Sequence, residues 1–216
     1  MTAHYPGTVT HELGPYGQYK RDIFTKLDLK FVPGKKMLDI GCGNGTDAEI
    51  FINIFELETF GVDVYRDDNI DNIKGLDFQQ ASILELPFYD DQFDYVFAHD
   101  VLHHIDEEHQ SNEKHITGLS EMKRVTAQNG TIVIVEANRY NPLGYPNMVL
   151  LNGHDHWKQS YFLQTVSEVF PDAQFKFFEA HNYPWGVKFW KAVEFAAEKF
   201  MPKRFLAYNV AVIKNA

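Results

Sequence analysis

Short apolar runs alternate with amphipathic segments along most of the chain. Runs rich in β-branched and aromatic residues, bounded by Gly, Pro, Asp or Asn, are typical of buried strands. We expect strands at Lys36–Ile40, Phe60–Asp63, Phe78–Ala81, Tyr95–Ala98, Thr131–Glu136, Gln174–Ala180 and Phe205–Ile213. Apolar residues at helical spacing predict helices at Asp47–Phe55, Asn112–Thr126, Gln159–Val169 and Val187–Phe200. This alternation predicts a single α/β domain built on a doubly wound, mostly parallel sheet.

Two segments break the alternation and are richer in aromatic residues, His, Gly and Pro, namely His4–Arg21 and Asn138–Trp157. Ligands bind and lids form at the carboxyl ends of the strands in such a sheet. We therefore divide the domain into an N-terminal lid (1–30), a cofactor-binding core (31–137), a substrate lid (138–170) and C-terminal strands with a helix (171–216). The alternative is that both segments are ordinary surface loops packed by their own aromatic side chains.

A glycine-rich loop follows the first expected strand, where the chain reads Leu-Asp-Ile-Gly-Cys-Gly-Asn-Gly-Thr-Asp from Leu38 to Asp47. Without a Cβ at alternate positions, the backbone can turn sharply and let a ligand lie against it. Asp39, just before the loop, can hold a cationic or hydroxyl-bearing group. The dinucleotide fingerprint G-x-G-x-x-G does not fit, because Thr46 stands where its third glycine belongs. The spacing therefore argues against a pyrophosphate cradle.

This loop resembles motif I of the class I S-adenosylmethionine-dependent methyltransferases. The resemblance implies that the loop wraps the methionine half of the cofactor, and that an acidic residue ending the second strand binds both ribose hydroxyls. Asp63 stands at that place, 22 residues after Gly41. Hydrogen bonds from a diol to a carboxylate are charge-assisted and therefore strong. The alternative for Asp63 is a turn residue at a strand end.

The resemblance runs with clear landmarks from Pro33 to Glu136. Gln80–Phe88 is similar to the family segment Gly-Asp-Ala-x-x-Leu-Pro-Phe, except that Ser82 replaces the Asp that binds adenine. A serine hydroxyl can still accept that bond, and the N–H of Ile83 can serve adenine N1. Leu119–Glu136 resembles Leu-x-Glu-x-x-Arg-Val-x-x-x-Gly-Gly and the strand after it, with Asn129-Gly130 in place of the glycine pair. The implied fold is Rossmann-like, with a seven-stranded sheet whose last strand is antiparallel.

The site residues follow from this resemblance. The residues expected to bind the cofactor are Tyr19, Asp39, Gly41, Cys42, Gly43, Gly45, Asp63, Val64, Tyr65, Ser82, Ile83, Ala98 and His99. The loop after the fourth strand reaches the methyl-bearing end of the cofactor, so His104 or, failing it, His103 is expected to be the general base. A histidine with an unperturbed pKa of about 6.5 can accept a proton near neutral pH. The alternative is that this Leu-His-His-Ile run merely packs.

The composition of the chain limits which binding partners can be expected. Thirty acidic residues against twenty basic ones give a formal net charge of −10, and we find no basic cluster suited to a phosphate backbone, which argues against nucleic acid. We find neither a membrane-spanning run nor a secretory leader, so we expect a soluble cytoplasmic protein. The single cysteine, Cys42, excludes an intramolecular disulfide and a cysteine-cluster metal site.

Two histidine pairs could in principle bind zinc, His103 with His104 and His154 with His156. Adjacent residues diverge on a strand or a helix, however, so we expect no metal. The apolar stripe of Val187–Phe200 could lie on a membrane surface, but we expect it to pack on the sheet.

The expected function is methyl transfer from S-adenosylmethionine, with S-adenosylhomocysteine as product, to an oxygen or nitrogen atom of a small, partly apolar molecule. We expect a monomer or homodimer without integral membrane association. Two alternatives remain open: an NAD(P)-dependent oxidoreductase, and an inactive methyltransferase-like domain that binds a partner.

Overall fold

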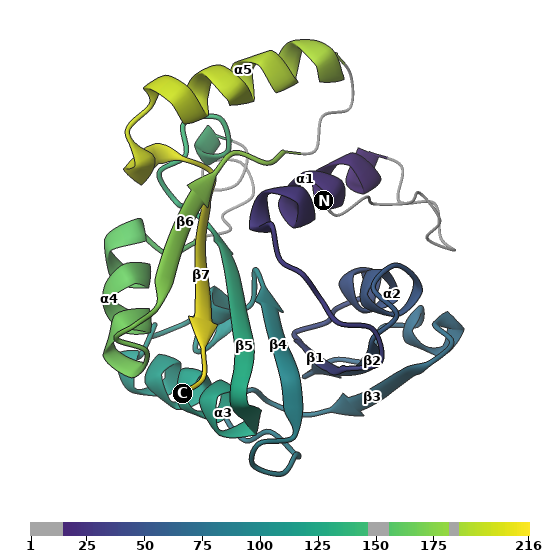
Figure 1. The fold of residues 1–216 in the computed structure, drawn as a ribbon. Coiled ribbons are helices and arrows are strands. Elements are labelled where there is room, and N and C mark those ends of the chain that lie inside the picture. The colour runs from purple at the N-terminus through teal and green to yellow at the C-terminus, as the bar shows by residue number, and fades with distance from the viewer. Residues whose placement is uncertain (1–14, 147–155, 182–185) are drawn as a thin grey trace.

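The computed structural model describes residues 15–146, 156–181 and 186–216, in which a single seven-stranded sheet forms the centre of the molecule (Figure 1). The strand order is β3-β2-β1-β4-β5-β7-β6. The strands are β1 (Lys36–Ile40), β2 (Glu58–Asp63), β3 (Leu76–Gln80), β4 (Phe93–His99), β5 (Thr126–Ala137), β6 (Gln174–Phe178) and β7 (Tyr208–Lys214). All seven expected strands are present, with ends that shift by a few residues.

Strands β1 to β5 pair in parallel, and β7 is antiparallel to both of its neighbours, β5 and β6. The expected doubly wound, mostly parallel sheet with an antiparallel last strand is therefore confirmed. The strand order reverses between β1 and β4, which is the point at which open α/β sheets bind their ligands.

The sheet is buried on both faces, and neighbouring residues of one strand serve different cores. Leu38, Val96 and Ile132 belong to the core beneath α3 (Asn112–Val125) and α4 (Gln159–Val169). Their neighbours Met37, Phe97 and Val133 belong to the core beneath α1 (Pro15–Leu27) and α2 (Thr46–Asn53). Because successive strand residues point to opposite faces, burial on both sides explains why these strands read as continuous apolar runs.

Helix α1 was not expected, because it lies in the segment assigned to the N-terminal lid. Its buried side chains, Tyr19, Ile23, Phe24 and Leu27, follow helical spacing and pack in the same core as α2. The apolar stripe was thus present in the sequence, but the surrounding Gly, Pro and Tyr residues obscured it. The remaining part of that lid, residues 1–14, and residues 147–155 of the expected substrate lid lie outside the described residues.

Helix α5 (Val187–Phe200) is present as expected, but its apolar side does not lie where the sequence pattern placed it. It lies next to α1 at the outer edge of the molecule (Figure 1), and Phe189, Phe195 and Phe200 are 63%, 67% and 77% exposed. The prediction that its apolar stripe packs on the sheet is therefore wrong. Asn129, which stands in place of a glycine of the family's pair, has a positive φ of 62°, a backbone conformation that Asn tolerates.

Candidate active site

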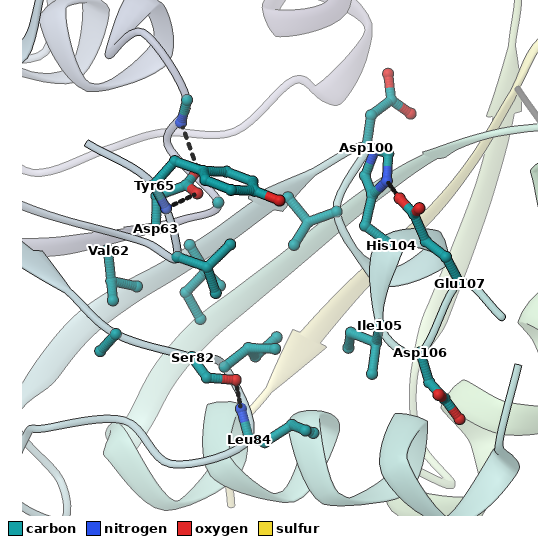
Figure 2. Close-up of a pocket in the computed structure, with 17 residues that line it drawn as sticks. Val62, Asp63, Tyr65, Ser82, Leu84, Asp100, His104, Ile105, Asp106 and Glu107 are labelled. Carbon is teal, nitrogen blue, oxygen red and sulfur yellow. Dashed lines mark hydrogen bonds and ion pairs between the residues drawn. The ribbon is translucent and has the colours of Figure 1, made fainter. Parts of the chain in front are cut away.

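A cavity of about 690 Å³ opens at the carboxyl ends of β1, β2 and β4 (Figure 2). Asp63 and Tyr65 lie on one side of it, and His104 and Glu107 lie on the other. Its lining consists of Ile40, Gly41, Gly43, residues 62–65, residues 81–84, Asp100, Val101 and residues 104–107. The cavity therefore lies at the switch point of the sheet and is built from four loops.

The glycine loop needs its glycines for two different reasons. Gly41 has a φ of +65°, and a Cβ there would lie 2.2 Å from Cγ2 of Val101. Gly43 also has a positive φ, but a Cβ there would meet nothing within 4 Å. Gly41 thus permits close packing inside the protein, while Gly43 leaves the main chain open to a ligand.

Asp63 supports the loop and faces the cavity from the end of β2. Its Oδ2 accepts the N–H of Gly43 at 2.9 Å, and its Oδ1 accepts the N–H of Tyr65 at 3.0 Å. Because a carboxylate has about four lone-pair sites, both oxygens can accept further bonds from a ribose diol. Val64 and Tyr65 follow it, 52% and 77% exposed, and offer apolar surface for a flat ring.

The segment after β3, residues 81–84, also lines the cavity. Ser82 and Ile83 line the cavity, and their binding of adenine stays a prediction. The Ser82 hydroxyl oxygen accepts the N–H of Leu84 at 3.1 Å, which fixes this turn and leaves the hydroxyl proton available for donation.

The other predicted cofactor ligands do not line this cavity. Asp39 is 2% exposed and lies behind the loop, where burial and the negative charge of Asp47 hold the pKa of its carboxyl well above the usual range. Burial likewise raises the pKa of the Cys42 thiol, which makes it a poor nucleophile. Gly45 precedes α2 with a φ of +80°, and Ala98 is fully buried in β4. A role of these residues in cofactor binding stays a prediction.

His99 and Tyr19 meet in a buried polar network that joins α1 to α2, β4 and β7. Lys20 Nζ donates to Asp47 Oδ2 at 2.6 Å, and Nδ1 of His99 lies 2.9 Å from the same oxygen. The Tyr19 hydroxyl lies 3.0 Å from Nε2 of His99 and 2.5 Å from the hydroxyl of Tyr208. Burial opposes ionisation of Asp47, but Lys20 and His99 outweigh it and hold the pKa of that carboxyl below its usual value. No local pattern in the chain predicts that Lys20, Asp47 and Tyr208 lie together, because they are far apart in the sequence.

Two carboxyl oxygens next to this network indicate which chemical groups of a ligand the site could bind. Oδ2 of Asp39 and Oδ1 of Asp47 are buried and have no hydrogen-bond partner among the described residues. A buried acceptor without a donor is costly, and a cationic group would satisfy it well. With the open face at Gly43 and the free lone pairs of Asp63, these residues fit a ligand that carries an ammonium group and a ribose.

His103 and His104 lie in different environments, one in the protein interior and the other at the cavity. His104 lines the cavity, and its Nδ1 contacts Oε1 of Glu107. His103 is 3% exposed, and its Nδ1 lies 2.8 Å from Oε2 of Glu136. Burial alone would lower the pKa of His103, but the charge of Glu136 and the hydrogen bond to it outweigh burial and raise it.

Glu136 organises this region from the end of β5. Its Oε1 accepts the N–H groups of Val101 at 2.9 Å and Leu102 at 2.6 Å, which fixes the 3-10 turn Leu102–His104. Glu136 is the last residue of the expected fifth strand, Thr131–Glu136, and was not among the predicted site residues.

Three buried side chains could hold a metal ion. One ligand atom from each of His103, Glu136 and His156 lies within 4.8 Å of the others, and two histidines with a carboxylate form a set that Zn²⁺ accepts. The bond between His103 and Glu136 satisfies the pair without an ion. This set differs from the two histidine pairs considered from the sequence, of which His154 lies outside the described residues. The absence of a metal stays an expectation.

Comparisons with known proteins agree with this geometry. Residues 38–134 match the model of a methyltransferase domain. The chain is 39% identical over 72 residues to a fatty-acid O-methyltransferase of Mycolicibacterium smegmatis, which covers 30% of this chain and 26% of that protein. It is 31% identical over 103 residues, 47% of this chain and 22% of the other, to a Mus musculus protein named "Probable tRNA methyltransferase 9B". The chain spans less than half the length of the curated relatives it matches.

A solved structure gives the same result for the fold. An S-adenosylmethionine-dependent methyltransferase from Archaeoglobus fulgidus superimposes with a TM-score of 0.63 at 20% identity, covering 90% of each chain. In the part of the chain that the structure describes, no helix combines the length and apolarity needed to cross a bilayer. Over residues 38–134 the chain is thus similar to a methyltransferase domain, and its sheet has the Rossmann-like fold seen in solved S-adenosylmethionine-dependent methyltransferases.

Proposed function

We propose that the protein transfers a methyl group from S-adenosylmethionine to a hydroxyl or amine of a small, partly apolar molecule. The lining of the cavity carries this proposal. It combines apolar side chains with the carboxyl groups of Asp63, Asp100, Asp106 and Glu107, and none of its described residues is Lys or Arg. Such a lining favours a neutral or cationic acceptor and repels phosphates and carboxylates.

The same lining argues against nucleic acid as the acceptor, although one relative is named for tRNA. Neutralising phosphates with Lys and Arg supplies most of the affinity for nucleic acid. Around this cavity the charges have the opposite sign, and the net charge of the whole chain is −10.

Different residues of the site would bind the ribose, the adenine and the methionine part of the cofactor. Asp63 would accept the ribose hydroxyls, Ser82 and Ile83 would face the adenine, and the glycine loop with the acceptor oxygens of Asp39 and Asp47 would face the methionine end. The cofactor supplies an activated methyl group whose thioether leaving group needs no protonation. The protein must therefore position the acceptor, exclude water and take the proton of the acceptor.

His104 is the first candidate for taking that proton, because it is the histidine that lines the cavity. Its contact with Glu107 through Nδ1 favours the tautomer in which Nε2 is basic. His103 lies directly behind it, with ring centroids 4.1 Å apart, and remains the second candidate. The N-terminal segment, through Tyr16 or Tyr19, and the segment from Arg139 to Trp157 stay the predicted lids that exclude water, and residues 1–14 and 147–155 of these segments lie outside the described residues.

The test is turnover of S-adenosylmethionine by the full chain with a panel of phenols, amines, fatty acids and bulk tRNA, with S-adenosylhomocysteine measured by mass spectrometry. We expect turnover with a phenol or amine, and turnover about ten- to a hundredfold lower in Asp63→Ala at limiting cofactor. General-base catalysis is worth about 10²- to 10⁴-fold, so His104→Ala should lose at least that much of kcat.

Several outcomes would contradict the proposal. Turnover with tRNA alone would replace the small-molecule acceptor, and cofactor binding without turnover on any acceptor would favour the inactive, partner-binding alternative. Losses below about tenfold in both His104→Ala and His103→Ala would leave neither histidine as the base.

A further inference from the structure

Helix α5 turns Lys191 and Glu194 toward the protein, on the side that also carries the partly buried Trp190 and Val193 and the buried Ala197. Glu198 Oε1 lies 2.5 Å from Nζ of Lys26, and Glu194 Oε2 lies 3.9 Å from the same ammonium group of α1. Lys191 pairs with Asp22 of α1 and with Glu194. These pairs hold α5 against α1, which Figure 1 shows next to it. Both acidic residues of α5 are used in this contact.

The opposite side of α5 is exposed and carries only Phe, Ala and Lys. At about 100° per residue, Phe189, Ala192, Ala196 and Phe200 form one row along the helix. Lys188, Phe195 and Lys199 form the adjacent row. All seven side chains are exposed, and the Lys199 ammonium lies 5.4 Å from the centroid of the Phe200 ring. Amphipathic helices of globular proteins have the reverse orientation, with the apolar side inward.

The basic character continues beyond the helix, because Lys203 and Arg204 follow it and are exposed. The outward face of α5 together with these two residues thus bears four positive charges, in a chain whose formal net charge is −10. Apolar rings interleaved with cations complement a surface that is apolar beneath and negatively charged on top. Lipid headgroups over acyl chains are such a surface.

We propose that α5 is an interfacial helix that docks the protein on an anionic membrane surface. Phe189, Phe195 and Phe200 enter the boundary between headgroups and acyl chains, and Lys188 and Lys199 extend along them to the anionic headgroups. This is peripheral binding in the plane of the interface. It does not depend on the proposed acceptor.

A second copy of the chain fits this face less well. Two copies related by a twofold axis would bring the same rows together, so lysines of one α5 would face lysines of the other. Like charges in such an interface are unfavourable, whereas an anionic lipid surface attracts each Lys or Arg near it.

The experiment is sedimentation of the full chain with phosphatidylcholine vesicles, with and without phosphatidylserine. We expect binding to the anionic vesicles only, weakened by salt. Replacing Lys188 and Lys199 by Gln should weaken it by about 25-fold, because each cation near the surface contributes about fivefold. The double variant Phe189→Asp with Phe200→Asp should abolish binding. Tyr89→Asp, which changes an aromatic residue that is 86% exposed but lies outside α5, is the matched control and should bind normally.

Binding of S-adenosylhomocysteine by each variant shows that it is folded. The proposal is overturned if the wild-type chain stays in the supernatant with anionic vesicles, or if the Phe double variant binds them as well as the control does. It is also overturned if analytical ultracentrifugation finds a dimer that the Phe variant dissociates, because the face would then join two copies.

Discussion

Asp63 shows how one residue serves both the fold and the ligand. Its two oxygens fix the backbone of Gly43 and Tyr65, and the same carboxyl group faces the cavity. A local carboxylate therefore shapes the loop before a ligand arrives, which reduces the entropy lost on binding.

Replacing Asp63 by Ala should weaken binding of S-adenosylhomocysteine by about ten- to a hundredfold, because charge-assisted bonds to the ribose are lost. Calorimetric titration measures this. Asp71→Ala is the control, since Asp71 is exposed, pairs with Arg66 on the surface and does not line the cavity. Equal affinities of wild type and Asp63→Ala would remove Asp63 from the binding site.

The buried pair of His103 and Glu136 predicts a pH dependence of stability. Glu136 raises the pKa of folded His103 above its unfolded value of about 6.5, against the effect of burial. The stabilisation is therefore complete below the unfolded pKa and is lost as pH rises through the folded pKa.

Glu136→Gln keeps an oxygen for the N–H groups of Val101 and Leu102 but removes the charge. We expect it to destabilise the fold by up to about 3 kcal/mol at pH 6 and by less at pH 9, as measured by urea unfolding. In a His103→Asn background this difference between the two pH values should disappear. A loss that does not change with pH would mean that the pair is not ionic.

Helix α1 illustrates what elements add to the site. It is anchored by Lys20, which reaches Asp47 of α2 and His99 of β4, and by Tyr19, which reaches Tyr208 of β7. These contacts tie the expected N-terminal lid to the helix that follows the glycine loop, so binding at the loop and the position of α1 should be coupled.

Lys20→Met should destabilise the protein by about 3 kcal/mol, because it leaves the Asp47 carboxylate buried without its ammonium partner. His99 still contacts Asp47, which places the effect at the lower end for a broken buried pair. Lys35→Met breaks the more exposed pair with Asp94 and should destabilise the protein much less than Lys20→Met. Recovery in Lys20→Met with Asp47→Asn would confirm the cause. Equal losses in the two single variants would argue against the anchor.

At the scale of the whole molecule, one sheet and two cores hold the four loops of the cavity in place. Because ligand binding to the folded state alone adds to its stability, heat denaturation distinguishes the possible cofactors.

S-adenosylhomocysteine at about 100 times its Kd should stabilise the fold by about 2.7 kcal/mol. For a chain of this size that corresponds to a rise in Tm of about 5–10 °C. NADH at the same concentration should leave the Tm unchanged. A larger rise with NADH would restore the oxidoreductase alternative that the glycine spacing disfavours.

Local patterns determined the strands, most helices, the glycine loop and Asp63. A strand buried on both faces reads as an apolar run, and a turn with positive φ favours Gly or Asn, as Gly41 and Asn129 show. These features depend on neighbours within a few residues, so the chain displays them directly.

Only the tertiary structure decided which distant side chains meet. Tyr19 and Tyr208 are 189 residues apart, and Glu136 of β5 reaches His103 in the 3-10 turn after β4, because the order of strands in the sheet sets these contacts. Helix α5 makes the same point for an element. Its period shows which residues share a face, but the ion pairs with α1 decide that Phe189 and Phe200 face outward. Periodicity fixes the sides of a helix, whereas long-range contacts fix its rotation.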